Sequence, residues 1–262
     1  MHTAPRISAM KSKKKIVMLT AYDYLMASYL EKAGVDIILT GDSLGMVFLG
    51  YNDTLPVTVD DIIYHVKAVK RGARDTMIVA DMPFMSYQDS VRTAVKNAGK
   101  IMKMSGASAV KLEGGHEICP QIKAITQIGI PVMGHIGLQP QSVNKYGGYP
   151  VQGATEKDKI RLISEAKSLE AAGAFALVAE KVASKTTALI TDAVEIPVIG
   201  IGSGPLCDGQ VLVTHDLLGA FEDFTPKFVK RYENLAARSV KAAAKFISDV
   251  RHRKFPGRKF YY

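Results

Sequence analysis

Short apolar runs rich in β-branched residues recur along the chain, and longer amphipathic stretches separate them. The runs are continuous rather than alternating, which is typical of parallel strands covered on both faces. They predict eight strands, at residues 16–20, 35–40, 77–80, 108–112, 131–135, 175–179, 197–201 and 210–214. Apolar positions at helical spacing predict helices at 23–33, 59–73, 88–105, 117–128, 156–172, 184–193 and 226–250.

The alternation of strands and helices predicts the fold class, a single α/β domain forming a (β/α)8 TIM barrel over residues 1–262. A chain of 262 residues suits one such barrel, which typically takes about 250. A doubly wound sheet is the rival architecture. It is disfavoured because the first strand runs into Ala21-Tyr22-Asp23, without the glycine motif that binds dinucleotides.

The charge of the chain changes the picture only at its ends. The total is +9, from 34 basic and 25 acidic residues. Residues 1–15 and 251–262 each hold five basic groups and no acid, so 24 basic and 25 acidic residues remain in 16–250. We expect the two ends to be basic tails outside the barrel strands. A nucleic-acid-binding protein, which the total would suggest, is therefore disfavoured, and we expect no nucleic-acid partner.

Neither a membrane nor an oxidising compartment is indicated. No apolar run approaches the roughly 18 residues needed to span a bilayer, and Ile16–Leu19 is too short for the core of a signal peptide. The two cysteines, Cys119 and Cys207, form neither a disulfide framework nor a metal-binding spacing. These features predict a cytoplasmic protein without a membrane partner.

Acidic residues follow four of the predicted strands. Asp42, Asp81, Glu113 and Glu180 each stand where a strand ends, and in a TIM barrel these ends form the active site. A lone acid there is equally well explained as a helix cap, but four converging carboxylates would repel each other without a cation. Oxygen ligands without a cluster of cysteine or histidine favour a hard cation, with Mg²⁺ as the main candidate.

Two basic side chains belong to the same predicted strand ends. Lys111 lies two residues before Glu113, so both side chains share one face of their strand. An inward lysine requires a partner; an anionic substrate carboxylate is favoured, and a buried pair with a protein carboxylate is the alternative. His135 ends the fifth strand and is either part of a hydrogen-bond network or a catalytic group. The glycine-rich 200–205 segment gives only a weak phosphate signal.

Long motifs make the chain resemble the ketopantoate hydroxymethyltransferase (3-methyl-2-oxobutanoate hydroxymethyltransferase) family. They cover nearly the whole length and include KIVMLTAYDY at 15–24, GDSLGMVFLGY at 41–51, VADMPF at 79–84, AVKLEGG at 109–115, GHIGLQPQ at 134–141 and GIGSGP at 200–205. The resemblance implies a TIM barrel and the transfer of a hydroxymethyl group from 5,10-methylenetetrahydrofolate to 3-methyl-2-oxobutanoate. The products would be 2-dehydropantoate and tetrahydrofolate, formed in pantothenate synthesis through a Mg²⁺-stabilised enolate.

The resemblance also implies roles for individual residues. Asp42 and Asp81 match metal-ligating and substrate-binding aspartates, and Glu113 matches a third acid at the metal. Ser43 and Lys111 match residues that hold the substrate carboxylate, Glu180 matches the catalytic base, and His135 would support the site by hydrogen bonding. One departure follows the base, where the run Lys181-Val182-Ala183 lacks a proline typical of the family.

Two further expectations rest on the resemblance alone. The chain would form a homo-oligomer, with a decamer as the expected state. The nearest rival enzymes are the phosphoenolpyruvate mutases and isocitrate lyases, which resemble the expected fold and also bind 2-oxo acids on Mg²⁺. The lyases among them use a Lys-Lys-Cys-Gly-His run that this sequence lacks.

Overall fold

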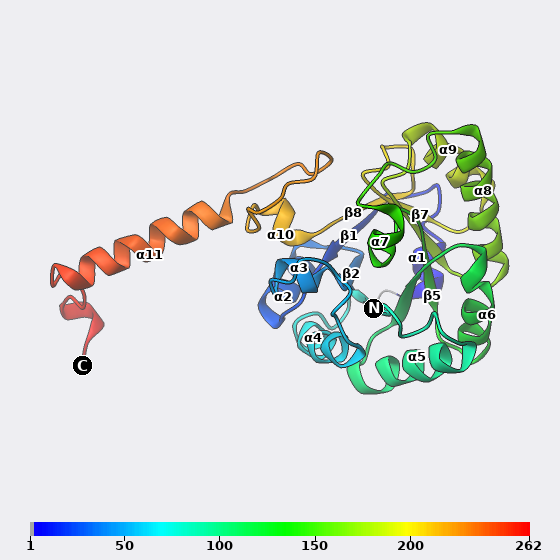
Figure 1. Ribbon diagram of the computed structural model, residues 1–262. Helices are drawn as coiled ribbons and strands as arrows, with labels where there is room; N and C mark the ends of the chain where they lie inside the picture. The colour runs from blue at the N-terminus through cyan, green and yellow to red at the C-terminus, as the bar shows by residue number, and fades with distance from the viewer. Residues whose placement is uncertain (1–2) are drawn as a thin grey trace. The chain divides into compact units, whose positions relative to one another are not determined.

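The computed structural model describes residues 3–262, which form two compact units, 3–212 and 213–262. The first unit is a closed barrel of eight parallel strands in chain order (Figure 1). Its strands are β1 Ile16–Thr20, β2 Ile37–Thr40, β3 Met77–Asp81, β4 Ala109–Glu113, β5 Val132–Gly137, β6 Ala176–Glu180, β7 Val198–Ile201 and β8 Gly209–Leu212. The predicted TIM-barrel fold is confirmed.

Helices of the first unit surround the strands. They are α1 Ala4–Ser8, α2 Tyr24–Ala33, α3 Leu44–Val47, α4 Val59–Gly72, α5 Val91–Ser105, α6 Cys119–Gln127, α7 Val143–Tyr146, α8 Glu156–Ala171 and α9 Ser184–Ala193, with 3-10 turns η1 His116–Ile118 and η2 Pro140–Ser142. Side-chain caps begin several of them; Thr58 and Asp61, for example, form a reciprocal capping box at α4. The short elements α1, α3, α7 and η2 were not predicted, because they lack the length that makes a periodic pattern visible.

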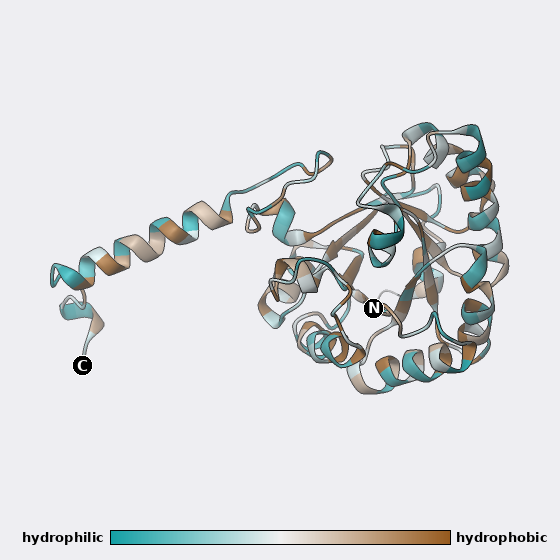
Figure 2. Cartoon of the chain, in the orientation of Figure 1, coloured by the Kyte–Doolittle hydropathy of each residue, from teal (hydrophilic) through white to brown (hydrophobic). Residues whose placement is uncertain are grey.

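Two hydrophobic layers build the barrel. Alternate strand residues, such as Met18, Val79 and Val178, point into the barrel and form the inner cluster. The residues between them pack against the helices in an outer cluster. Figure 2 shows the strands as largely hydrophobic. Because the strands are buried on both faces, their sequences are the continuous apolar runs from which they were predicted.

The connection between β7 and β8 departs from the regular alternation. Residues 202–208 join these strands without a helix. On the neighbouring outer face of the barrel, the outward-pointing Val17 of β1 is 47% exposed and Gln210 of β8 is also exposed. The sequence pattern predicted no helix between the seventh and eighth strands, and the structure has none there.

The N-terminal segment is not a free tail. Ile7 of α1 is fully buried and joins the inner cluster. Lys11 pairs with Asp208 at 2.9 Å and Lys14 with Asp36 at 3.0 Å. Two of its basic residues are therefore paired with acids at the N-terminal end of the barrel, and the whole segment precedes the first barrel strand.

The second unit contains α10 Thr214–Leu217, α11 Leu235–Arg251 and η3 Arg258–Phe260. The predicted helix 226–250 is wrong in its first nine residues, because Asn234 caps α11 by accepting a hydrogen bond from Ala237 N. No residue of α11 is buried, and its apolar residues include Val240, Phe246 and Ile247.

None of the helices formed by residues 3–262 has the length and apolar character needed to cross a membrane.

Candidate active site

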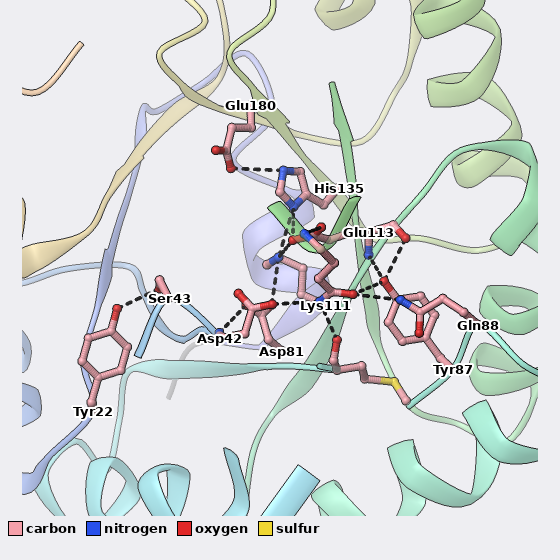
Figure 3. A network of polar contacts seen from close by, with 12 residues as sticks. Tyr22, Asp42, Ser43, Asp81, Tyr87, Gln88, Lys111, Glu113, His135 and Glu180 are labelled. Atoms are coloured by element: carbon pink, nitrogen blue, oxygen red, sulfur yellow. Dashed lines mark hydrogen bonds and ion pairs between the residues drawn. The ribbon is translucent and has the colours of Figure 1, made fainter. Parts of the chain in front are cut away.

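Charged side chains occupy the C-terminal end of the barrel interior. Inward-pointing Val79, Ala109 and Val178 belong to the inner cluster. Two residues further along the same strands the period of two brings in Asp81, Lys111 and Glu180. On each of these strands, the inward-pointing side chain therefore changes from apolar to charged at the next inward position. Figure 3 shows this group, which also includes Glu113 and His135.

Asp42 and Ser43 reach the group from the turn after β2. The Asp42 N–H donates to Asp81 Oδ2 at 3.0 Å, and Ser43 Oγ lies 2.8 Å from Tyr22 Oη. Gly41 permits this close approach, because a Cβ there would stand 3.0 Å from both Asp81 Oδ2 and Ser43 Oγ. A side chain at residue 41 would therefore require Asp81 or Ser43 to shift.

Lys111 is a buried cation surrounded by acids. Its Nζ lies 2.8 Å from Asp81 Oδ1 and 3.9 Å from Glu113 Oε1. Burial lowers the pKa of Lys111, but the charges of Asp81, Glu113 and Asp42 outweigh this and raise it above its ordinary value. The sequence favoured a substrate carboxylate as the partner of Lys111, whereas the structure shows the alternative, a pair with protein carboxylates, in which Lys111 remains charged.

His135 bridges two of the acids. Its Nδ1 lies 3.3 Å from Glu113 Oε1 and its Nε2 3.3 Å from Glu180 Oε2. Burial and the Lys111 charge lower the pKa of His135, yet Glu113 and Glu180 together raise it to about 9. The imidazolium then forms an ion pair with each of these two carboxylates. Its 3.2 Å contact with Lys111 Nζ is consequently a repulsive approach between two cations.

The carboxylates themselves carry more charge than their partners balance. Burial, then the charges of Asp81 and Glu113, raise the pKa of Asp42 well above its usual range. Burial also raises the pKa of Asp81 despite Lys111. For Glu113, the burial effect is outweighed by His135 and Lys111, and its pKa is lowered. When Glu180 is included, the group holds four carboxylates. Only Lys111 and His135 are cationic, so a divalent cation would restore neutrality.

The donor set fits Mg²⁺ as a partial ligand shell. Within residues 3–262, no three His, Cys, Asp or Glu side chains converge as a ready ligand set for a metal ion. Mg²⁺ commonly takes only one or two carboxylates and fills its octahedron with water and substrate oxygens. Asp42 and Asp81 can supply these two carboxylates. Both are buried, and the Asp42 N–H donates to the Asp81 carboxylate.

A polar scaffold that sequence reasoning missed supports the acids from behind. Gln141 of η2 donates from Nε2 to Asp42 Oδ2 at 2.9 Å and from its backbone N–H to Glu113 Oε2 at 3.1 Å. The Tyr87 hydroxyl lies within hydrogen-bonding distance of the Glu113 backbone on both its N–H and its C=O. Gln141 ends the GHIGLQPQ motif, but no strand pattern indicates that a residue in a later loop points back into the barrel.

Glu180 is held differently from the other acids. Its side chain is 17% exposed. Its backbone C=O accepts from Leu138 N at 2.8 Å, and Gly137 is required beside it because a Cβ would lie 2.4 Å from that oxygen. Lys181 has a left-handed φ of 49°. The segment without proline is held by Gln152, which donates to Lys181 O and accepts from Ala183 N.

The remaining candidates have structural explanations. Ser203 of the glycine-rich segment is buried, donates to Ala179 O at 2.7 Å and accepts from Val182 N at 3.0 Å. Its hydroxyl is thus used to join β6 and β7, and the weak phosphate signal gains no support. Cys119 and Cys207 are both free.

Comparison with known proteins decides the family. The family described as ketopantoate hydroxymethyltransferase matches residues 1–258. The chain belongs to this family. Among curated 3-methyl-2-oxobutanoate hydroxymethyltransferases, that of Clostridium botulinum (strain Alaska E43 / Type E3) is 57% identical over 93% of this chain and 88% of its own. That of Pseudothermotoga lettingae is 55% identical over 96% and 95%. The family and enzyme class that the motifs predicted are confirmed.

This hydroxymethyltransferase also resembles solved structures of the rival enzyme group. The resemblance is in fold only. A phosphonopyruvate hydrolase in complex with oxalate and Mg²⁺ has a TM-score of 0.62 at 14% identity, covering 99% of this chain and 93% of that one. A 2,3-dimethylmalate lyase of the PEP mutase/isocitrate lyase superfamily has a TM-score of 0.60 at 14% identity, covering 98% and 90%.

Proposed function

We propose that this chain transfers a hydroxymethyl group from 5,10-methylenetetrahydrofolate to 3-methyl-2-oxobutanoate, giving 2-dehydropantoate and tetrahydrofolate. The observation that carries the proposal is the buried group of Asp42, Asp81, Lys111 and Glu113 beside a more exposed Glu180, in a chain of the ketopantoate hydroxymethyltransferase family. Such a group suits a small anionic oxo acid that must lose a proton from carbon.

Asp42 and Asp81, with Glu113 beside them, would hold Mg²⁺, which supplies polarisation of the carbonyl group next to the reacting carbon. Lys111 and the Ser43 hydroxyl bind and orient the substrate carboxylate. Lys111 is already charged and held in place by Asp81, so it needs no proton transfer to do this. Tyr22 Oη restricts the orientation of Ser43 Oγ through their 2.8 Å contact.

Glu180 takes the proton from C3 of the oxo acid as general base. The C3–H electron pair then forms the new carbon–carbon bond with the folate methylene carbon as one of its two carbon–nitrogen bonds breaks. Water forms the carbon–oxygen bond as the second carbon–nitrogen bond breaks, and the two nitrogens of tetrahydrofolate take up the proton from C3 and one proton of the water. His135 is a positioning residue for this step, because its Nε2 contacts Glu180 Oε2 at 3.3 Å and leaves the second carboxylate oxygen to face the substrate.

An assay of one-carbon transfer from methylenetetrahydrofolate to 3-methyl-2-oxobutanoate tests the function. The expected result is formation of 2-dehydropantoate with added Mg²⁺ and its loss after exhaustive EDTA treatment. Product formation that survives EDTA would remove the metal from the scheme. Absence of product at any metal concentration, with a folded protein, would refute the proposed reaction.

The proposal includes a homo-oligomer in the cytoplasm. The exposed apolar residues of α11 support self-association, since a helix with an apolar stripe and no buried residue has unused packing surface. The decamer rests on the family resemblance. Light scattering after gel filtration tests the assembly, and a monomer at micromolar concentration would refute it. We propose small-molecule substrates only, with neither a nucleic-acid nor a membrane partner.

A further inference from the structure

Gln141 is the polar side chain that connects the two sides of the acidic group. It is buried, at 5% exposure, in the turn after β5. Its Nε2 donates to Asp42 Oδ2 at 2.9 Å and to Met82 O at 3.0 Å, while its backbone N–H donates to Glu113 Oε2 at 3.1 Å. One residue thus fixes one oxygen of an acid after β2 and one oxygen of an acid on β4.

The other end of the same amide is also fully used. Gln141 Oε1 lies 2.9 Å from Gln88 Nε2 and 2.9 Å from the Tyr87 hydroxyl. An amide that meets only acceptors at one end and a donor at the other has one possible orientation. The single Tyr87 hydroxyl proton is shared between Gln141 Oε1 and Glu113 O, so the network also reaches the backbone of β4.

The chemistry of an amide suits this place. The Gln141 amide donates to Asp42 without adding charge, and the backbone N–H of the same residue donates to Glu113, so both acids are oriented while their negative charge stays available to a cation. A glutamate here would repel Asp42, and a lysine would compete with the metal. The buried contacts at both ends prevent the amide from turning away, because each unpaired partner would be costly.

We propose that Gln141 is a positioning residue for metal binding, holding the Asp42 and Glu113 carboxylates in the orientation that accepts Mg²⁺. The inference rests on the proposed function, since it takes these acids as the metal site. It differs from a merely structural role in one respect. A structural glutamine would change stability when replaced, whereas a positioning glutamine changes the affinity of the free enzyme for the metal.

The experiment compares Gln141→Met with a matched control, Gln121→Met, in the full chain. Gln121 is also buried, at 7% exposure, and donates to Tyr87 O at 3.4 Å, but it contacts none of the four acids in the described contacts. Methionine keeps the length of the side chain, and in Gln141→Met the backbone N–H to Glu113 remains. Mn²⁺ alone serves as the probe, with free ion measured by electron paramagnetic resonance and thermal unfolding measured in parallel.

We expect Gln141→Met to weaken Mn²⁺ binding by about 10- to 100-fold, as for other residues that orient metal ligands. We expect Gln121→Met to weaken Mn²⁺ binding by less than about twofold, however much this variant loses in stability. Equal Mn²⁺ affinity of Gln141→Met and wild type would overturn the inference, and so would equal losses in both variants. Failure of the wild type itself to bind Mn²⁺ would instead contradict the proposed function.

Gln88→Met keeps the test decisive if Gln141→Met does not fold. Gln88 touches the amide but none of the acids among the described contacts, so its loss loosens Gln141 only. We expect a weakening of Mn²⁺ binding between those of the other two variants, and excess Mg²⁺ should restore its turnover. Unchanged Mn²⁺ affinity in Gln88→Met, together with a misfolded Gln141→Met, would refute the positioning role.

Discussion

Buried aspartates stand at both ends of the barrel, and their partners differ. At the N-terminal end, Asp208 accepts from Val198 N and Ser12 N and pairs with Lys11, and Asp36 accepts from Val17 N and pairs with Lys14. At the C-terminal end, the acids face one another across two shared cations. Burial alone therefore does not mark a catalytic acid. What marks it is unbalanced negative charge, since each N-terminal aspartate has a lysine of its own whereas the C-terminal acids share Lys111 and His135.

The largest effect is expected from replacing Glu180, the most exposed of the acids at the C-terminal end of the barrel. Glu180→Gln keeps the shape of the side chain but cannot take a proton. We expect deuterium exchange at C3 of 3-methyl-2-oxobutanoate, followed by NMR without folate, to fall by about 10²- to 10⁴-fold. The exposed Glu195→Gln is the control and should exchange like wild type. Exchange in Glu180→Gln as fast as in wild type would exclude Glu180 as the base.

Replacing one aspartate at each end tests the comparison directly. Asp81→Asn removes a metal candidate, and we expect Mn²⁺ affinity to fall at least about 100-fold, beyond the effect of residues that only orient ligands. Asp208→Asn should leave Mn²⁺ affinity unchanged. If both variants lost affinity alike, the two ends would not be functionally distinct.

The pKa of His135 gives the C-terminal end a characteristic dependence on pH. Because this pKa is about 9 in the folded protein against 6.5 ordinarily, the folded state binds the proton more tightly than the unfolded chain. The resulting stability is fully present below pH 6.5 and is lost as the pH rises through 9, by at most on the order of 3 kcal/mol. Urea unfolding at several pH values should show this slope in wild type. A slope of the same size in His135→Gln would assign it to other groups.

The stability effect of Asp208→Asn should be smaller. Asparagine retains one acceptor oxygen for a backbone N–H but loses the ion pair with Lys11, whose side chain is 15% exposed. We expect a loss of roughly 1–3 kcal/mol in the free energy of unfolding, because buried donors lose their acceptor. Unfolding in urea measures it. A loss below about 0.5 kcal/mol would show that α1 is held mainly by Ile7.

The smallest effect is expected for Lys14→Ala. Lys14 is 66% exposed, and an exposed ion pair contributes less than about 1 kcal/mol. Asp36 keeps its bond from Val17 N in this variant. A loss of unfolding free energy as large as that of Asp208→Asn would mean that solvent does not screen the ion pair between Lys14 and Asp36.

The sequence predicted those parts of the molecule that follow from local pattern. The strands were visible because continuous apolar runs reflect burial on both faces, and Asp81, Glu113 and Glu180 were found because they end such runs. Gln141 and Tyr87 were not found, because their partners lie in other loops and depend on how those loops fold back. The helix start at Leu235 was missed because the apolar pattern continues upstream of it. The cap formed by Asn234 nevertheless begins the helix at Leu235.

The pairing of β1 with β8 has a consequence for refolding. Residues 16–19 pair with 209–212, so this contact closes a loop of nearly the whole first unit. Contacts of such sequence separation form slowly. Until β8 docks, the sheet has two open edges that can pair with another chain. Refolding of this protein should therefore lose yield as its concentration rises, with aggregation competing against the last strand.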